Sequence, residues 1–225
     1  MRRWVFLLTF GLSGAAVLIW LGVWQLQRLE WKLTALAEID DRITAIPVPV
    51  PGAPDPEADK YLPVQSRGTV MPGEVHVLVS VKDVGAGYRI IAPFELSDGR
   101  RILLDRGFVR STAKESLRGT GALEVIGNLH WPQEVDGYTP EPDLVGNIWF
   151  ARDVPRLATA LDTLPILLIV RTTSETNPAT TPLPIDSAGI PNDHLQYAIT
   201  WFSLAAIWLV MTGFFLRGSR ARTES

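Results

Sequence analysis

Both ends of this chain are apolar enough to cross a membrane, and this feature limits the possible folds more than any other. Residues 4–26 and residues 195–215 contain no charged side chain. At a rise of about 1.5 Å per residue, a helix over either run would span the hydrocarbon core of a bilayer, which is about 30 Å thick. The sequence therefore predicts two transmembrane helices that bracket the rest of the chain.

The first apolar run could also belong to a cleaved signal peptide, because Ala35-Leu36-Ala37 resembles a small-residue cleavage site. However, the apolar region of a secretory signal is only about 7–15 residues long. A charged stretch also separates this run from the small residues. We therefore expect a retained membrane anchor.

The basic residues near the termini indicate how the two helices are oriented. Arg2 and Arg3 precede the first run, and Arg217, Arg220 and Arg222 follow the second. Since basic residues concentrate on the cytoplasmic side, both termini are expected in the cytoplasm and the central segment outside. The lack of an Arg- and Ser-rich presequence favours a bacterial inner membrane, with the central domain in the periplasm.

Composition supports this location but limits the partners. The chain has no cysteine and a formal net charge of −3. A cysteine-free outer domain is compatible with an oxidising compartment. Weak net acidity gives no basis for a nucleic-acid partner, whereas the apolar ends make membrane lipid an expected one.

Helical spacing continues beyond the first apolar run. Leu29, Leu33, Leu36 and Ile43 recur at helical intervals, so we expect the first helix to extend well past the membrane surface. The proline-rich stretch "PVPVPGAPDP" then stops the helix, because proline lacks a backbone donor and restricts the residue before it. We expect this stretch to act as a stiff linker.

The central segment shows the patterns of strands and one short helix. We predict strands over residues 74–81, 88–96, 100–110, 122–131, 147–150 and 166–170, a hairpin turn at "SDG" (97–99), and a short helix within residues 153–162. The predicted fold is a membrane protein in which two transmembrane α-helices bracket a mostly antiparallel β domain of the α+β class. This outer domain is expected to be barrel-like or sandwich-like.

These patterns divide the chain into six segments. They are an N-terminal transmembrane helix with an outward helical extension (1–46), a proline-rich linker (47–60), a periplasmic β-rich domain (61–176), a return loop (177–193), a C-terminal transmembrane helix (194–216) and a cytoplasmic basic tail (217–225).

The sequence contains none of the common catalytic motifs. There is no phosphate-binding glycine loop, no paired-cysteine metal motif and no G-x-S-x-G elbow. His76 alternates with valines and is expected on the solvent face of a strand, and His130 is expected at a strand end beside a loop. Because neither histidine belongs to a nucleophile–base constellation, we expect that the protein is not an enzyme.

His194 differs because it opens the second apolar run, in the segment "NDHLQYAITWF". Polar and aromatic residues are common at a membrane–water interface, so His194, Tyr197 and Trp201 could simply lie there. On a helix, however, they share one face with Ala198 and Ala205. This face offers a nitrogen ligand, two aromatic surfaces and small residues that would admit a planar cofactor such as haem.

The first helix has a matching end. "LGVWQLQRLEWK" places Trp24, Gln25, Arg28 and Lys32 where the first span leaves the membrane. If the two helices pair, Gln25, Arg28 and His194 gather at the outer interface. The two cations could contact carboxylates of a ligand, or they could extend toward the aqueous interface without a ligand.

Small residues suggest that the two helices do pair. Gly11, Ala15, Leu18 and Gly22 form a narrow stripe along the first span. Small side chains let the backbones of two membrane helices approach closely. The stripe is therefore suited to close packing against another helix.

Several of these segments together resemble the Surfeit locus protein 1 family of cytochrome c oxidase assembly factors. The resemblance rests on "LGVWQLQRLEWK", "GYRIIAPFEL", "RILLDRGFVR", "WFARDVPRLATAL" and "NDHLQYAITWF", which follow the family's order over nearly the whole chain. It implies a membrane chaperone that binds haem a and helps place it in the catalytic subunit of the haem-copper oxidase. The implied protein partners are that subunit and haem a synthase.

The resemblance also assigns residues to haem a. It implies that the second-helix histidine, His194, is the axial ligand of the iron. We expect the haem-binding residues to be His194 as the metal ligand, Gln25 beside it, Trp24, Tyr197 and Trp201 as walls, and Arg28 with Arg106 at the propionates. The motif "RGFV", which contains Arg106, could instead be a structural feature at a strand end. In the main alternative, the protein is a scaffold that holds oxidase subunits or haem a synthase and binds no haem.

Overall fold

The computed structural model describes residues 2–176 and 178–221, which form two compact units. The helical unit comprises Met1–Glu38 with Ser187–Ser225, and the β unit comprises Ile39–Asp186. The predicted return loop (177–193) begins outside the described residues, at Asn177. The side chains of Arg2, Arg3, Arg220 and Arg222, which carry the orientation prediction, also lie outside them.

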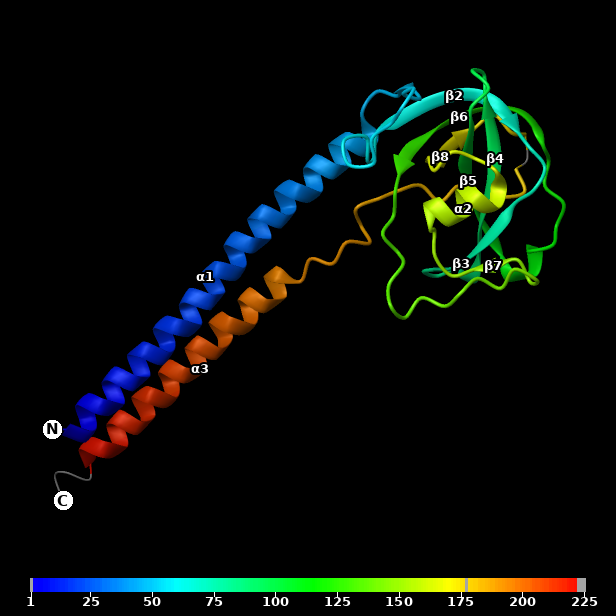
Figure 1. The fold of residues 1–225 in the computed structure, drawn as a ribbon. Coiled ribbons are helices and arrows are strands. Elements are labelled where there is room, and N and C mark those ends of the chain that lie inside the picture. Colours follow the sequence, from blue (N-terminus) through cyan, green and yellow to red (C-terminus); the bar gives the residue numbers. More distant parts are fainter. Residues whose placement is uncertain (1, 177, 222–225) are drawn as a thin grey trace. The chain divides into compact units, whose positions relative to one another are not determined.

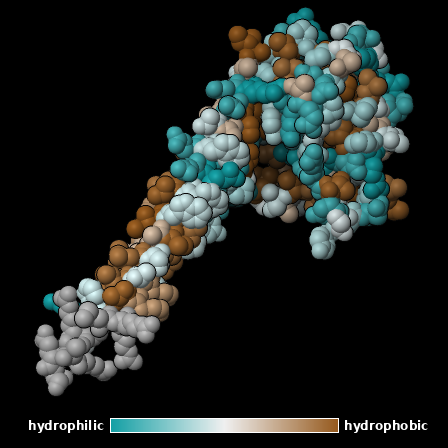
Figure 2. Space-filling model, turned by 60° about the vertical axis from the view of Figure 1, so that its left-hand side comes forward, coloured by the Kyte–Doolittle hydropathy of each residue, from teal (hydrophilic) through white to brown (hydrophobic). Residues whose placement is uncertain are grey.

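The helical unit contains most of helix α1 and all of helix α3, two long helices that run antiparallel and side by side (Figure 1). Helix α1 spans Arg2–Thr44, and helix α3 spans His194–Ala221. Both are long and apolar enough to cross a membrane. Figure 2 shows hydrophobic side chains along their outer surface. The extension of the first helix past its apolar run agrees with the helical spacing of the sequence.

The small-residue stripe of α1, whose spacing suits close helix packing, is the surface that packs against α3. A Cβ atom added to Gly11 would lie only 2.1 Å from the side chain of Thr212, and one added to Gly22 would lie 2.7 Å from the ring of Phe202. Ala15 between them is buried. Because glycine has no side chain, the two helices approach closely at these positions.

The β unit contains the strands, one short α-helix and one 3-10 helix. Its elements are β1 (Val48–Pro49), β2 (Pro63–Val70), β3 (Val75–Val81), β4 (Gly85–Leu96), β5 (Arg101–Arg110), η1 (Ser111–Ala113), β6 (Gly121–His130), β7 (Ile148–Trp149), α2 (Val154–Leu161) and β8 (Leu167–Thr173). The six predicted strands correspond to β3, β4, β5, β6, β7 and β8. Prediction missed β1 and β2, because Pro63, Arg67 and Gly68 break the apolar alternation that marks a strand.

Within the described residues, all strands join one sheet in the order β1-β2-β6-β8-β5-β4-β3-β7, and β2 also pairs with β4. This second pairing joins Gly68 to Leu96 and Val70 to Phe94. It closes β2, β6, β8, β5 and β4 into a ring, so the domain is barrel-like rather than sandwich-like. An added Cβ atom at Gly68 would lie 2.3 Å from the carbonyl oxygen of Glu95, so glycine permits the close approach.

The sheet is mostly antiparallel, as predicted, but it is mixed because it also contains three short parallel pairs. β1 and β2, β3 and β7, and β5 and β8 are parallel pairs. Parallel neighbours need a long crossover, and the chain between β5 and β8 provides one that includes β6 and α2. Periodicity identifies strands but not their partners, so the sequence pattern did not reveal these pairs.

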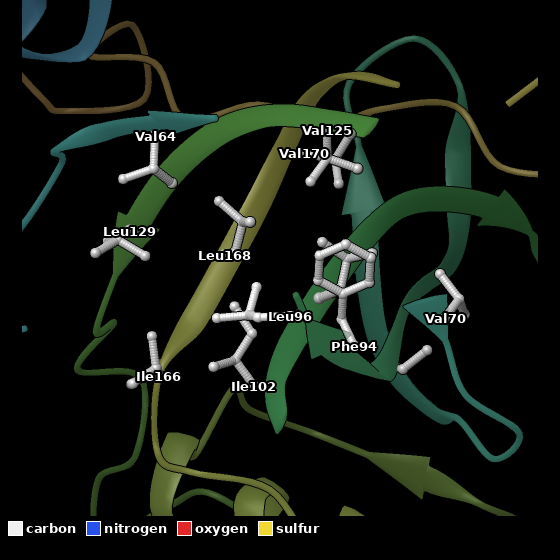
Figure 3. Packing of buried hydrophobic residues seen from close by; sticks show 12 residues of the cluster. Val64, Val70, Phe94, Leu96, Ile102, Val125, Leu129, Ile166, Leu168 and Val170 are labelled. Atoms are coloured by element: carbon white, nitrogen blue, oxygen red, sulfur yellow. The ribbon is translucent and has the colours of Figure 1, made fainter. Parts of the chain in front are cut away.

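Two apolar cores lie on opposite sides of the ring. Inside it, side chains from all five ring strands point toward one another, among them Val64, Phe94, Leu129 and Leu168 (Figure 3). The second core lies between α2 and the sheet and includes Leu157, with residues of β3, β4, β5, β7 and β8. The ring strands are thus buried on both faces where α2 covers them.

The predicted hairpin turn and the predicted cap of the short helix are both present in the β unit. Gly99 has a φ of +85°, and the backbone N–H of Leu96 donates to the carbonyl of Arg100 at 2.8 Å, which forms the "SDG" turn. Asp153 caps α2 by accepting from the N–H of Arg156. Both features depend on residues close in sequence.

The proline-rich stretch is attached to the β unit instead of being free. Val48 and Pro49 pair with β2. The guanidinium of Arg100 donates to the carbonyl oxygens of Pro51 at 2.6 Å and Gly52 at 2.9 Å. The last turn of α1 is held in the same unit, because the amide of Asn128 donates to the carbonyl of Ile43 at 2.9 Å.

Candidate functional site

The strongest candidate site is built by His194 and Gln25, which meet inside the helical unit. The Nδ1 atom of His194 lies 2.8 Å from Oε1 of Gln25. An amide oxygen only accepts hydrogen bonds, so Nδ1 carries the proton and donates. In the neutral imidazole the other nitrogen, Nε2, then holds a lone pair and can bind a metal.

The packed interface between α1 and α3, called the seam below, explains why these two side chains meet. Gln25 continues the stripe of α1 three residues after Gly22 and is only 9% exposed. His194 begins α3 and lies four residues before Ala198, which is buried in the same seam. A polar pair thus closes the outer end of a mostly apolar interface, and the two side chains hydrogen-bond to each other.

The predicted aromatic residues flank this pair. Trp24 directly precedes Gln25 and is 43% exposed, and Tyr197 is 54% exposed. Trp201 is partly buried, one helical turn after Ala198. The residues of the face predicted for α3 therefore differ in exposure: His194 contacts α1 and Trp201 is partly buried, whereas Tyr197 is exposed. Exposed aromatic surfaces beside a nitrogen ligand suit a flat apolar group.

Arg28 lies on the same face of α1 as Gln25, three residues further along. Its guanidinium is exposed and sits 4.6 Å from the ring centre of Trp31. Stacking on an aromatic ring holds the cation in place without neutralising it, so Arg28 can still pair with a carboxylate. Lys32 follows one turn later and is partly buried.

Arg106 belongs to the β unit, and its side chain already has a partner. Its Nη2 atom lies 3.0 Å from both carboxylate oxygens of Glu175, and the side chain is buried. The next residue, Gly107, has a φ of +110°, and an added Cβ would lie 2.1 Å from the carbonyl oxygen of Thr181. These contacts favour the structural interpretation of "RGFV" over a role at haem propionates.

The prediction for His76 was wrong, because this residue is buried rather than on a solvent face. It is 4% exposed, and its Nε2 atom lies 2.8 Å from Oε1 of Glu74. The segment that follows η1 covers this face, and Arg118 there donates through Nε to Glu74 at 2.8 Å. Strand alternation could not reveal this cover, which comes from a polar segment far along the chain.

The Glu74 carboxylate is the centre of this buried network. Burial alone would raise its pKa, but the hydrogen bonds from His76 and Arg118 outweigh burial and lower the pKa of Glu74 to about 2. Arg118 also donates to the carbonyl of Ala113 at 3.1 Å. All hydrogen-bond partners of Arg118 thus come from the β unit, which indicates that Arg118 holds η1 against β3.

His130 lies at the end of β6, as predicted. Its ring stacks on Tyr61 with 5.2 Å between ring centres. Burial, and then the positive charges of Arg152 and Lys60, lower the pKa of His130 to about 4. The imidazole is therefore neutral near pH 7 and contributes packing rather than charge.

No other metal centre competes with His194 among the residues that the structure describes. No group of three or more His, Cys, Asp or Glu side chains comes together there. A single imidazole fits an axial ligand of haem, because the porphyrin supplies the remaining in-plane ligands. It does not fit a structural zinc site, which needs four protein ligands.

The chain matches known proteins over most of its length. It matches the SURF1 family over residues 12–206, a range that contains Gln25 and His194. It is 30% identical to Surfeit locus protein 1 of Rattus norvegicus, over 89% of this chain and 72% of that protein. The human Surfeit locus protein 1 is 31% identical, over 88% and 74% respectively. A SURF1-like protein of Rickettsia bellii is 26% identical, over 92% and 89%.

Proposed function

We propose that this chain, which belongs to the SURF1 family, is an assembly factor of haem-copper cytochrome c oxidase that binds haem a and helps insert it into the catalytic subunit. The observation that carries this proposal is the hydrogen bond between His194 and Gln25. Haem a is the cargo in this function, and haem a synthase would be its source. The protein would act in a bacterial inner membrane, with both termini cytoplasmic and the β unit periplasmic.

His194 is the proposed axial ligand. Metal-binding histidines usually donate their second ring N–H to a fixed acceptor, which sets the tautomer and the direction of the ring. Gln25 provides that acceptor through Oε1. The pair therefore presents the Nε2 lone pair toward a ligand without any rearrangement of the seam.

The neighbouring side chains would supply the remaining contacts. Trp24, Tyr197 and Trp201 offer aromatic surface to the macrocycle, and Arg28 is placed to pair with a propionate. Arg106 is left out of the proposed site because its side chain is buried in the β unit and its Nη2 already pairs with Glu175.

The arrangement suits delivery better than permanent storage. One protein ligand at a partly exposed site holds the cargo by a bond that can break when a better site is offered. The side chain that hydrogen-bonds to His194 is the amide of Gln25, which cannot titrate and so cannot act as a general base. We therefore propose a carrier that is not an enzyme.

The visible absorption spectrum tests this function most directly. The native protein and His194→Ala would be purified from cells that make haem a. We expect a haem a band in the native protein that is lost in His194→Ala, with Gln27→Ala as a control on an exposed position of α1. Equal bands in native and His194→Ala protein would contradict ligation by His194.

The scaffold function remains a second candidate because the β unit exposes apolar side chains. On the segment between β6 and β7, Tyr138 and Val145 are almost fully exposed and Leu144 is 74% exposed. Exposed aromatic and aliphatic groups are typical of protein interfaces. If replacing these residues by serine lowered the haem content of the oxidase while His194→Ala did not, the scaffold function would be favoured.

A further inference from the structure

A second feature of the helical unit has no role in the site described so far. An apolar groove of about 500 Å³ lies between α1 and α3, within the membrane-spanning parts of both helices. Its lining includes Phe10, Gly14 and Val17 of α1 and Leu204, Ile207 and Met211 of α3.

The groove lies on the same side of the helix pair as the candidate haem residues. On α3, Tyr197, Leu204 and Met211 follow one another at intervals of seven residues, and seven residues are almost two full turns. On α1, Trp24 and Val17 are related in the same way. The α3 wall of the groove therefore lies on the same face of its helix as Tyr197, and the α1 wall lies on the same face as Trp24.

The chemistry of the groove selects a chain without polar groups. The indole of Trp208 forms part of its wall, and its N–H donates to the carbonyl of Gly11 at 2.9 Å. The hydroxyl of Ser13 donates to the carbonyl of Phe10 at 3.1 Å. The polar hydrogens of both side chains are thus used within the helix pair, which leaves apolar surface for a ligand.

The wall is also fixed in position. An added Cβ atom at Gly14 would lie 2.6 Å from the indole of Trp208, so the indole packs directly on the backbone of α1. Together with the hydrogen bond to Gly11, this contact holds the ring in one orientation. Because the side chains of a preformed groove are already ordered, ligand binding costs little conformational entropy.

We propose that this groove receives the isoprenoid side chain of haem a, an inference that rests on the proposed function. Haem a and haem o carry a farnesyl-derived chain at the edge of the ring, whereas haem b lacks it. Leu204 lies ten residues after His194, which is about 15 Å along α3. A farnesyl-derived chain that begins at a ring held by His194 is long enough to reach the groove. The groove would thus make the protein selective for farnesylated haems.

The test compares haem o with haem b on the full-length protein in detergent micelles. The groove would be filled by Leu204→Trp, and Leu209→Trp is the matched control. Leu204 and Leu209 are 42% and 41% exposed, but only Leu204 lines the groove. The measured quantity is the ratio of the two dissociation constants, obtained by absorption titration for each variant.

We expect the native protein and Leu209→Trp to prefer haem o, and Leu204→Trp to lose about fivefold of that preference with little change for haem b. The effect is modest because the isoprenoid chain moves from the apolar interior of the micelle into an apolar groove, so that only packing contacts are gained. Partitioning of haem o into micelles is the same for all variants and cancels in the comparison. Val17→Phe fills the groove from the opposite wall. If Leu204→Trp misfolds, Val17→Phe should show the same loss of preference for haem o.

The other outcomes separate this inference from the proposed function. If haem binds but neither groove variant changes the ratio, the groove holds lipid acyl chains, and the isoprenoid assignment is overturned while haem binding stands. If the native protein binds neither haem, the proposed function and this inference both fail.

Discussion

The imidazole of His194 and the side-chain amide of Gln25 meet at 2.8 Å between α3 and α1, at one end of a mostly apolar interface. The amide leaves only one neutral tautomer for the imidazole, with the proton on Nδ1. A contact between two residues far apart in the chain therefore determines which nitrogen of His194 can bind a metal.

Under the proposed function, replacing Gln25 by leucine should weaken haem binding while leaving the proposed axial ligand, His194, in place. Leucine cannot accept from Nδ1, so the ring loses its fixed tautomer and orientation. Loss of such a supporting contact typically lowers metal affinity about 10–100-fold. Absorption titration with haem a measures this change, and Gln27→Leu, on an exposed position of α1, should bind like the native protein. Equal affinities for all three proteins would show that Gln25 does not orient His194.

Replacing Arg118 by methionine should destabilise the β unit. The change leaves the carboxylate of Glu74 partly buried beside His76 without its main cationic partner. Removal of one member of a buried ion pair costs about 3 kcal/mol. The free energy of unfolding in urea, measured by tryptophan fluorescence on the full chain, reports the loss.

The exposed pair of Arg67 and Glu124 provides the control for that experiment. Their side chains are mostly exposed to solvent, and Arg67 Nε lies 2.6 Å from Glu124 Oε1. Arg67→Met should change stability little, because water screens exposed ion pairs. A loss as large as that of Arg118→Met would mean that burial does not set the strength of these pairs.

Gly107→Ala should be more damaging than Gly73→Ala. Both glycines have a positive φ, at +110° and +96°, which by itself makes alanine unfavourable by about 1 kcal/mol. At Gly107 the new Cβ would also lie 2.1 Å from the carbonyl oxygen of Thr181, whereas the space beside Gly73 is open. Thermal unfolding should show a clearly larger drop in Tm for Gly107→Ala, and equal drops would mean that Thr181 moves away freely.

His130 should make the β unit less stable as the pH falls from about 6.5 to 4. Burial lowers the pKa of His130 from 6.5 to about 4, so the unfolded chain binds a proton that the folded chain refuses. The contribution of neutral His130 to the free energy of unfolding is therefore fully present above pH 6.5. It is lost as the pH falls toward 4, and the loss amounts to about 3 kcal/mol at most.

The measurement is the free energy of urea unfolding between pH 7 and pH 4 for native protein and His130→Phe. Phenylalanine keeps the stacking on Tyr61 but does not titrate, so its curve should be flatter in this range. Glu74 has a pKa lowered to about 2 and contributes a loss only below pH 4.5, which separates the two effects. Parallel curves for both proteins would exclude His130 as the source.

The sequence by itself determined the features that depend on neighbouring residues. The two apolar runs, the "SDG" turn and the cap at Asp153 follow from local hydrophobicity, backbone preference and a hydrogen bond within a few residues. The stripe of Gly11 and Gly22 also marked the packing face of α1, because helical periodicity fixes which residues share a face.

Only the tertiary structure decided the features that join distant segments. The pairing of β2 with β4, the parallel pair β5 and β8, and the burial of His76 under the segment with Arg118 all bring together residues that periodicity treats separately. The same holds for the contact of His194 with Gln25, whose residue types were visible in the sequence but whose hydrogen bond was not. Side-chain alternation tells which face a residue takes, but what covers that face depends on long-range packing, which one strand or helix does not encode.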